Sequence, residues 1–263
     1  MRRKYDFVFS LGAACLCSQT LRNARLQYAS FPLDWVYGGG MALRTDLVLN
    51  GFRGWFEQGD FALQENPDAF GHDPYVNVRT GMLFPHEFDK GVPIAESYPA
   101  VRARMDRRAA RLRERLVKSR RALIVWIGDP RDTHRLTVEE LEDCICRFES
   151  SFPQAAFELL AIDRVPDVPA DGMRRYERGK IRFYGFDYKA YEAGAADWHY
   201  HQEMLAPFFD DIRVADYRTR EEKARFAARQ FENECARFGA TSRWTLRWKK
   251  LKYKLGKHFA KRA

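Results

Sequence analysis

Tyr5-Asp-Phe-Val-Phe-Ser-Leu11 is a short run of mostly apolar and aromatic residues, and Gly12-Ala-Ala-Cys15 follows it directly. The run predicts a buried strand. Gly12 permits a tight turn after it, and the apolar spacing beyond the turn predicts a helix over residues 13–24. We therefore expect a strand, a tight turn and a helix in this order, with Cys15 in the first turn of the helix.

The rest of the chain alternates between segments typical of strands and of helices. Strands are predicted at 122–127, 156–162, 180–185 and 212–214, with a hairpin within 76–84. Helices are predicted at 41–49, 99–119, 137–150, 197–209 and 219–238, the third opened by a capping box and the second by Pro99 at its first position. Strands separated by helices imply an α/β fold, a mostly parallel sheet flanked by helices. We expect one α/β domain over 1–242 and a basic helical tail over 243–263.

The positive charge of the chain is confined to its C-terminal end. The formal net charge is +9, yet residues 243–263 alone hold nine Lys or Arg and no acidic residue. The remaining residues hold 36 basic and 36 acidic side chains. Because the body is neutral overall and carries no nucleic-acid fold signature, nucleic acid is not the partner that we expect.

An apolar stripe runs along the basic tail. Trp244, Trp248, Leu251, Leu255 and Phe259 fall on one side of a helix. Basic residues occupy much of the remaining surface, a pattern typical of helices that lie in the interface of an anionic membrane. The alternative is a terminal helix that docks on the body through the same stripe. The membrane interpretation predicts a cytoplasmic protein held peripherally on the inner face of the membrane.

Cysteine usage and hydropathy limit the compartments in which we expect the protein. Five cysteines, an odd number, do not suggest a disulfide framework, so a reducing cytoplasm fits. No run approaches the ~18 apolar residues of a membrane span, and the first residues do not resemble a signal peptide. Cys15-x-Cys17 and Cys144-x-Cys146 lie in helical sequence, where residues two apart face apart. We therefore expect no metal site and no cofactor.

Cys15 carries the strongest chemical signal of any residue. At the start of a helix, free N–H groups and the positive end of the helix dipole favour a thiolate. The ordinary alternative is a small buried hydrophobic residue at a strand–helix junction. Ligands of parallel sheets gather beyond the carboxyl ends of the strands, where the loops at 12–15 and 128–134 are both expected.

Several segments resemble a bacterial family described as papain-like cysteine peptidases of unknown function. They are Ser10-Leu-Gly-x-x-Cys15, Leu21-Arg22, Ser30-Phe-Pro-Leu-Asp34-Trp35, and Gly81-Met-Leu-Phe-Pro-His86-Glu87-Phe88, which is similar to the family's Phe-x-His-Asp-Phe segment. The likeness covers roughly residues 1–165. This chain has Glu87 where the family usually has Asp, and Leu33 where it usually has Phe.

A papain-like site is what the resemblance implies. Cys15 would be the nucleophile and His86 the base, with Asp34 or Glu87 fixing the tautomer of the imidazole. The N–H of Cys15 would help to hold an oxyanion. Taken without the resemblance, His86 could equally be a core histidine within an aromatic segment, and Asp34 a helix cap or a turn former.

An arginine-rich helix supplies a second candidate site. Arg104, Arg108, Arg111 and Arg115 recur at three- and four-residue spacings and share a face. We expect Arg108 and Arg111 to face a concave surface that accepts an acidic or phosphorylated substrate, and the alternative is a solvated face. The expected substrate-binding residues are Gly12, Trp35, Arg108, Arg111, Asp129 and Arg131.

The leading interpretation is an enzyme, a Cys–His hydrolase or acyl transferase that works through a thioester. The alternative is a membrane-associated transferase or binding protein for an anionic glycan or lipid-linked sugar, in which Cys15 is structural. A binding module without catalysis is favoured if Cys15 and His86 lie far apart.

Overall fold

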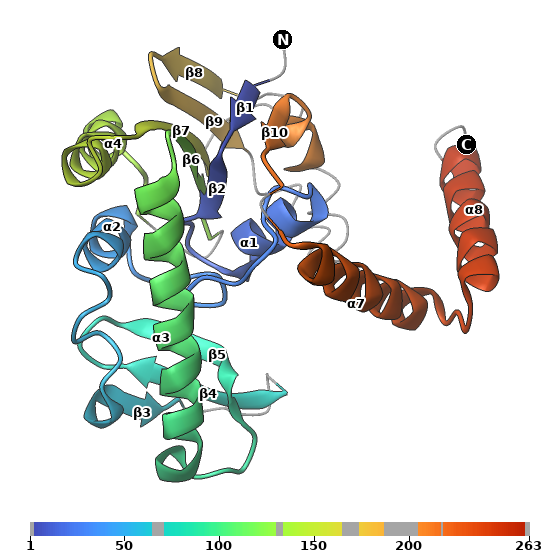
Figure 1. Ribbon diagram of the computed structural model, residues 1–263, viewed down its shortest axis with the longest axis horizontal. Helices are drawn as coiled ribbons and strands as arrows, with labels where there is room; N and C mark the ends of the chain where they lie inside the picture. Colours follow the sequence, from blue (N-terminus) through green and yellow to red (C-terminus); the bar gives the residue numbers. More distant parts are fainter. Residues whose placement is uncertain are drawn as a thin grey trace. The chain divides into compact units, whose positions relative to one another are not determined.

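The protein is described by a computed structural model in which the chain forms two compact units, 1–215 and 216–263 (Figure 1). The residues that the structure describes are 3–64, 71–129, 134–164, 174–186, 205–216 and 218–260. The expected boundary at residue 242 differs from the observed one. The second unit also includes the helix that precedes the tail, because the two helices pack on each other.

A five-stranded sheet forms the centre of the first unit in the described part of the chain. Its strands, in spatial order, are β2 (Phe7–Ser10), β6 (Arg121–Ile127), β7 (Ala156–Arg164), β9 (Ile181–Phe186) and β8 (Arg174–Arg178). The first four are parallel, and β8 is an antiparallel edge strand that the sequence did not predict. The expected α/β fold with a mostly parallel sheet is confirmed.

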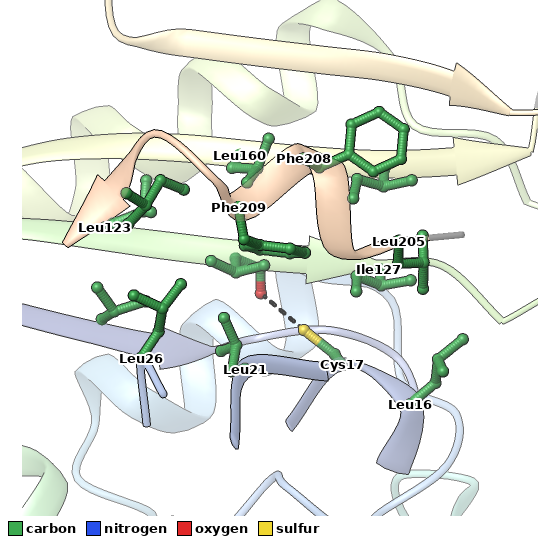
Figure 2. Close-up of a cluster of buried hydrophobic side chains, with 14 of the residues drawn as sticks. Leu16, Cys17, Leu21, Leu26, Leu123, Ile127, Leu160, Leu205, Phe208 and Phe209 are labelled. Atoms are coloured by element: carbon green, nitrogen blue, oxygen red, sulfur yellow. Dashed lines mark hydrogen bonds between the residues drawn. The ribbon is translucent and has the colours of Figure 1, made fainter. Parts of the chain in front are cut away.

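One face of this sheet packs against α1 (Cys15–Asn23). Because side chains alternate along a strand, every second residue of β6 and β7 points to this face. Figure 2 shows the resulting cluster of buried side chains, which includes Leu16, Cys17, Leu21, Leu26, Leu123, Ile127, Leu160, Leu205, Phe208 and Phe209. The predicted strand–turn–helix unit is thereby anchored on the sheet.

The opposite face of the sheet packs against α4 (Val138–Ser151). Phe9 of β2 and Phe157 of β7 both contact Phe148 of this helix, with ring centroids 5.7 and 5.2 Å away. Helix α2 (Met41–Leu49) packs beside α4. Helices therefore cover both faces, which is how a parallel sheet excludes water from its strands.

Two predicted helix starts are confirmed by their capping boxes. Thr137 caps α4 and exchanges hydrogen bonds with Glu140, and Thr219 and Glu222 do the same for α7 (Arg220–Phe238). Both boxes satisfy N–H groups that would otherwise lack a partner at the helix start.

A second, antiparallel sheet lies beside the first within the same unit. It consists of β3 (Phe61–Leu63), β4 (His72–Asn77) and β5 (Met82–Asp89), so the hairpin expected around residue 80 is present. An aromatic cluster fills its inner side, with Phe56 in contact with both Phe84 and Phe88. This sheet carries His86, and its position decides whether the predicted site exists.

Helix α3 (Ile94–Lys118) runs along both sheets (Figure 1). It begins five residues before the expected start, so Pro99 lies inside the helix and not at its first position. The early turns are held by tertiary contacts, since Tyr98 donates a hydrogen bond to the carbonyl oxygen of Phe56 at 2.8 Å. Such a contact offsets the backbone hydrogen bond that a proline removes.

Short elements complete the first unit. They are β1 (Arg3–Tyr5), which pairs in parallel with β10 (Ile212–Val214), and the single turns η1 (Gln58–Asp60) and η3 (Ala206–Phe209). Of the helix expected over 197–209, residues 197–204 lie outside the described residues.

The second unit pairs α7 with α8 (Arg243–Ala260). Gly239 ends α7 in a left-handed conformation, with φ of 58°, which allows the chain to turn into the next helix. None of the helices in the described part of the chain is both long enough and apolar enough to cross a membrane.

Candidate active site

Cys15 is the first residue of α1, at the carboxyl end of β2. Ala14 at the N-cap is extended and offers no side-chain cap to the first turn. The loop before it is pressed onto the sheet, since a Cβ atom on Gly12 would lie 2.7 Å from the backbone nitrogen of Ile127. Gly12 therefore acts by close packing, and it sets the position at which the helix and its cysteine begin.

The two neighbouring cysteines of α1 have different surroundings. Cys17 points at the sheet, is completely buried and donates a hydrogen bond to the carbonyl oxygen of Val125 at 3.4 Å (Figure 2). Burial raises the pKa of the Cys17 thiol to about 12. Cys15 lies about 200° away around the helix. Its side chain therefore points away from the five-stranded sheet and contacts the antiparallel sheet.

His86 meets Cys15 from strand β5. The Sγ atom of Cys15 lies 3.6 Å from Nε2 of His86, within hydrogen-bonding range for sulfur. Seventy-one residues separate the two in the sequence. The structure thus brings together the nucleophile and the base that the resemblance implied.

An irregularity in the hairpin aims His86 at this position. Phe88 pairs with Asp73 and Phe84 with Tyr75, so three residues of β5 lie opposite one residue of β4. Both phenylalanines are completely buried, whereas His86 between them is exposed. The alternative of a core histidine is wrong, because the bulge turns the imidazole out of the aromatic cluster.

The imidazole of His86 lies between two other rings. Its centroid is 6.4 Å from that of Trp35 and 6.3 Å from that of His72, both in edge contacts. Partial burial of the His86 ring, which leaves the residue exposed overall, is the first cause that lowers its pKa; the nearby charge of His72 lowers the pKa further, while Glu87 acts in the opposite direction. A lowered pKa keeps the imidazole neutral near pH 7, the form that can accept a proton from a thiol.

Tyr37 is a third member of the site that the sequence did not indicate. Its Oη lies 3.0 Å from Sγ of Cys15 and accepts the S–H of the thiol. Two backbone hydrogen bonds with Leu83, of 2.9 and 3.0 Å, attach Tyr37 to the strand that carries His86. When the thiol is deprotonated, the same hydroxyl can donate to the sulfur or to an oxyanion beside it.

Arg44 on α2 holds the loops around Cys15 in place by hydrogen bonds to their backbones. Its side chain is fully buried and donates to backbone carbonyl oxygens alone: those of Leu11, Gly12, Ala13, Leu33, Val36, Gly38 and Gly39. Burial lowers the pKa of the guanidinium to about 10, which leaves it charged at neutral pH. One side chain therefore links the loop that ends at Cys15 to the loop that carries Tyr37. The sequence held an indication that Arg44 is buried, because it falls on the same helix face as the apolar residues Met41, Leu47 and Val48.

Asp34 does not orient His86. Its Oδ2 accepts hydrogen bonds from Nε2 of Gln27 at 2.6 Å and from the backbone N–H of Phe31 at 2.8 Å, and Arg22 lies 3.6 Å away. Its Oδ1 is buried without a hydrogen-bond partner. The catalytic role assigned to Asp34 is corrected to that of a buried turn former, since its carboxylate is used within its own segment.

The burial of Asp34 predicts an unusual dependence of stability on pH. Burial raises its pKa to about 6, above the ordinary value of 3.8, so the native state holds a proton that the unfolded state releases. Stability should therefore fall as pH rises from about 4 to about 6, by up to about 3 kcal/mol. Asp34→Asn keeps both accepted hydrogen bonds and removes this dependence. Any cost of the unpaired amide is constant with pH.

Chemical unfolding at pH 4.5 and pH 7 measures this effect. We expect Asp34→Asn to gain about 2 kcal/mol of stability relative to the wild type between pH 4.5 and pH 7. Asp210→Asn, at an exposed carboxylate, is the control. An equal pH dependence in the wild type and in Asp34→Asn would contradict the prediction.

Glu87 does not hydrogen-bond to His86 either. Its Oε2 accepts from Nε of Arg104 at 2.9 Å and its Oε1 from Nη1 of Arg108 at 2.5 Å. Glu87 is buried and lies beside His86 on the strand, so it acts on the imidazole only through its charge. Its assigned role as the orienting carboxylate is corrected to that of an anchor between β5 and α3.

The arginine face of α3 is directed at the protein. Arg108, with 13% of its side chain exposed, binds Glu87, and Arg111 donates to the carbonyl oxygen of Ser30 at 3.0 Å. The expectation of an anion-accepting surface at these two residues is not met, because their donors hold β5 and the segment around Asp34 on the helix. A buried carboxylate and buried carbonyl groups require such partners.

The three remaining residues that we expected to bind substrate are Trp35, Asp129 and Arg131. Trp35 lies in the site, with its ring edge against His86 and the guanidinium of Arg22 5.3 Å from its centroid. Asp129 is buried just beyond β6, close enough for its charge to act on Arg44. Arg131 lies outside the described residues. Within the described residues, no group of three or more His, Cys, Asp or Glu side chains could hold a metal ion.

Comparison of the chain with protein-family models, with curated proteins and with solved structures finds no match.

Proposed function

We propose that the protein is a Cys–His enzyme, a hydrolase or acyl transferase whose reaction passes through a thioester on Cys15. The observation that carries the proposal is the sulfur of Cys15 at a helix start, 3.6 Å from Nε2 of His86 and 3.0 Å from Oη of Tyr37. A thiol, a neutral imidazole and a hydroxyl donor around one atom supply a nucleophile, a base and an oxyanion partner. The motifs in residues 1–165 that resemble those of the papain-like cysteine peptidase family point to the same proposal.

Each proposed step uses groups in this site. His86 Nε2 takes the proton of the thiol, and the thiolate attacks the carbonyl carbon of an ester, thioester or amide. Tyr37 and the first-turn N–H groups of α1 stabilise the oxyanion. The bond to the leaving group breaks as the imidazolium returns its proton to that group. Water or an acceptor alcohol or amine then cleaves the thioester, with His86 again as the base.

Access to Cys15 constrains the substrate. Cys15 is 3% exposed, while His86 beside it is exposed and Trp35 is half-buried. A substrate must therefore reach a sulfur with little exposed surface, beside the exposed ring of His86. The free cysteines and the proposed thiol nucleophile fit a reducing compartment such as the cytoplasm.

The alternative function, binding or transfer of an anionic glycan or lipid-linked sugar, draws less support from the site. It relied on the arginine face, and Arg104 and Arg108 on that face bind Glu87. It also made Cys15 structural, a role that Cys17 fills.

Alkylation by iodoacetamide tests the proposal. At pH 7 we expect Cys15 to react at least about tenfold faster than Cys146, although Cys146 is exposed and Cys15 is buried. His86→Gln should slow Cys15 to or below the rate of Cys146, while His134→Gln, at a histidine paired with Glu140, should have no effect. Peptide mass spectrometry after brief labelling gives each rate.

The pH dependence of labelling adds an internal check. Because the pKa of His86 is lowered, the base stays neutral below pH 6.5, and labelling should fall only as pH drops through the lowered pKa. His72→Gln removes a neighbouring charge, so it should move this fall to higher pH. Equal labelling of Cys15 and Cys146, or an unchanged rate in His86→Gln, would count against the enzyme.

A further inference from the structure

Helix α8 is held on α7 by one of its faces. Leu246 is 5% exposed, Nζ of Lys249 donates to the carbonyl oxygen of Gly239 at 2.6 Å, and Lys250 forms an ion pair of 2.5 Å with Glu234. At about 100° per residue, these three side chains lie within about 100° of one another around the helix. This face fixes α8 to its neighbour within the second unit.

The opposite face of α8 is apolar and exposed. Trp244, Trp248 and Leu251 are 75%, 50% and 49% exposed. They lie within about 60° of one another and roughly opposite to Leu246. The residues that dock α8 on α7 are therefore not the residues of the apolar stripe, so docking within this unit leaves the stripe uncovered.

Basic side chains flank the exposed stripe on both sides. Arg247 and Lys252 are exposed and lie about 60–80° to either side of it. Nζ of Lys252 is 5.3 Å from the ring centroid of Trp248. No acidic residue occurs in 243–263. An aromatic stripe between cationic side chains matches a surface that is apolar in depth and anionic at its boundary.

We propose that α8 is a membrane-binding surface that places this stripe in the interface of an anionic lipid bilayer. Tryptophan rings suit the boundary between headgroups and acyl chains, and each basic group near an anionic leaflet adds to binding. A purely electrostatic partner such as a nucleic acid would leave the two exposed tryptophans without a role. The proposal is independent of the chemistry at Cys15.

Flotation of the full chain with vesicles tests the proposal. Phosphatidylcholine vesicles with and without 30% phosphatidylglycerol are compared at about 50 and 300 mM salt. We expect binding to the anionic vesicles alone and weaker binding at high salt. The triple variant Trp244→Ala, Trp248→Ala, Leu251→Ala should bind at least about tenfold more weakly. The variant Leu63→Ala, Val78→Ala, Val117→Ala removes three other exposed apolar side chains and should bind like the wild type.

Folding and the nature of the anion are checked in the same samples. Because the stripe is exposed, the triple α8 variant should keep the thermal midpoint of the wild type, and a large fall would show that the stripe is docked elsewhere on the chain and overturn the proposal. Equal flotation of the two triple variants would also overturn it. So would tight binding of a DNA duplex that the stripe variant retains, since that result identifies a polyanion and not a lipid surface.

Discussion

Replacing Arg44 with methionine should unfold the protein or remove most of its stability. Arg44 is completely buried and is the hydrogen-bond donor to seven backbone carbonyl groups around residues 11–13 and 33–39. Methionine fills a similar volume but donates nothing. Each buried acceptor left without a partner costs about 1–3 kcal/mol, and a typical domain is stable by only about 5–15 kcal/mol. We expect a loss of at least about 4 kcal/mol.

Urea unfolding of three variants measures this loss. Arg53→Met changes an exposed arginine nine residues further on and should shift stability by less than about 0.5 kcal/mol. Arg44→Lys keeps the charge but has three N–H donors on one atom in place of five on a planar fork, so its stability should fall between those of the other two variants, and it should lose the fast alkylation of Cys15. A loss below about 1 kcal/mol in Arg44→Met would show that the carbonyl groups find other partners.

Replacing Cys15 with alanine should abolish acyl transfer and leave the fold almost unchanged. We expect p-nitrophenyl acetate to acetylate Cys15 with release of p-nitrophenolate, and Cys15→Ala to lose this reaction by at least about 10³-fold. The thermal midpoint should change little, because deleting one small sulfhydryl costs roughly 1 kcal/mol. Intact-mass spectrometry and a thermal melt report the two quantities.

Cys17→Ala is the matched control, since it lies two residues away on the same helix. Cys17 packs in the core and hydrogen-bonds to Val125, so its loss should lower stability more than the loss of Cys15 while acetylation continues. Acetylation that persists in Cys15→Ala, or a large fall in its stability with acetylation retained, would make Cys15 a structural residue.

Local sequence determined much of the fold. The apolar run before Gly12 defined β2, and β6 and the centre of β7 (residues 159–162) were defined by continuous apolar sequence, because strand segments covered on both faces have no polar side. The capping boxes at Thr137 and Thr219 fixed two helix starts, because they depend only on residues three positions apart. The start of α3 was predicted wrongly at Pro99, because a contact between Tyr98 and Phe56 holds the earlier turns.

The candidate site depended on more than local sequence. Cys15 at a helix start could be read directly, and a resemblance was needed to select His86. The partners of Asp34 and Glu87 could not be predicted from the sequence, because a buried carboxylate accepts hydrogen bonds from whichever donors the packing supplies, here Gln27 for Asp34 and Arg104 for Glu87, among others.

Three features were decided by tertiary structure. A bulge in β5 aims His86 at the sulfur, two backbone hydrogen bonds to Leu83 place Tyr37 beside it, and Arg44 holds both loops in position. Cys15 and His86, like Tyr37 and Leu83, are distant along the chain, and the geometry of the three features follows from strand register and from the need of buried polar groups for partners. The sequence by itself determined most of the elements and singled out Cys15, whereas the tertiary packing of the two sheets, together with the loops held by Arg44, determined what surrounds the sulfur of Cys15.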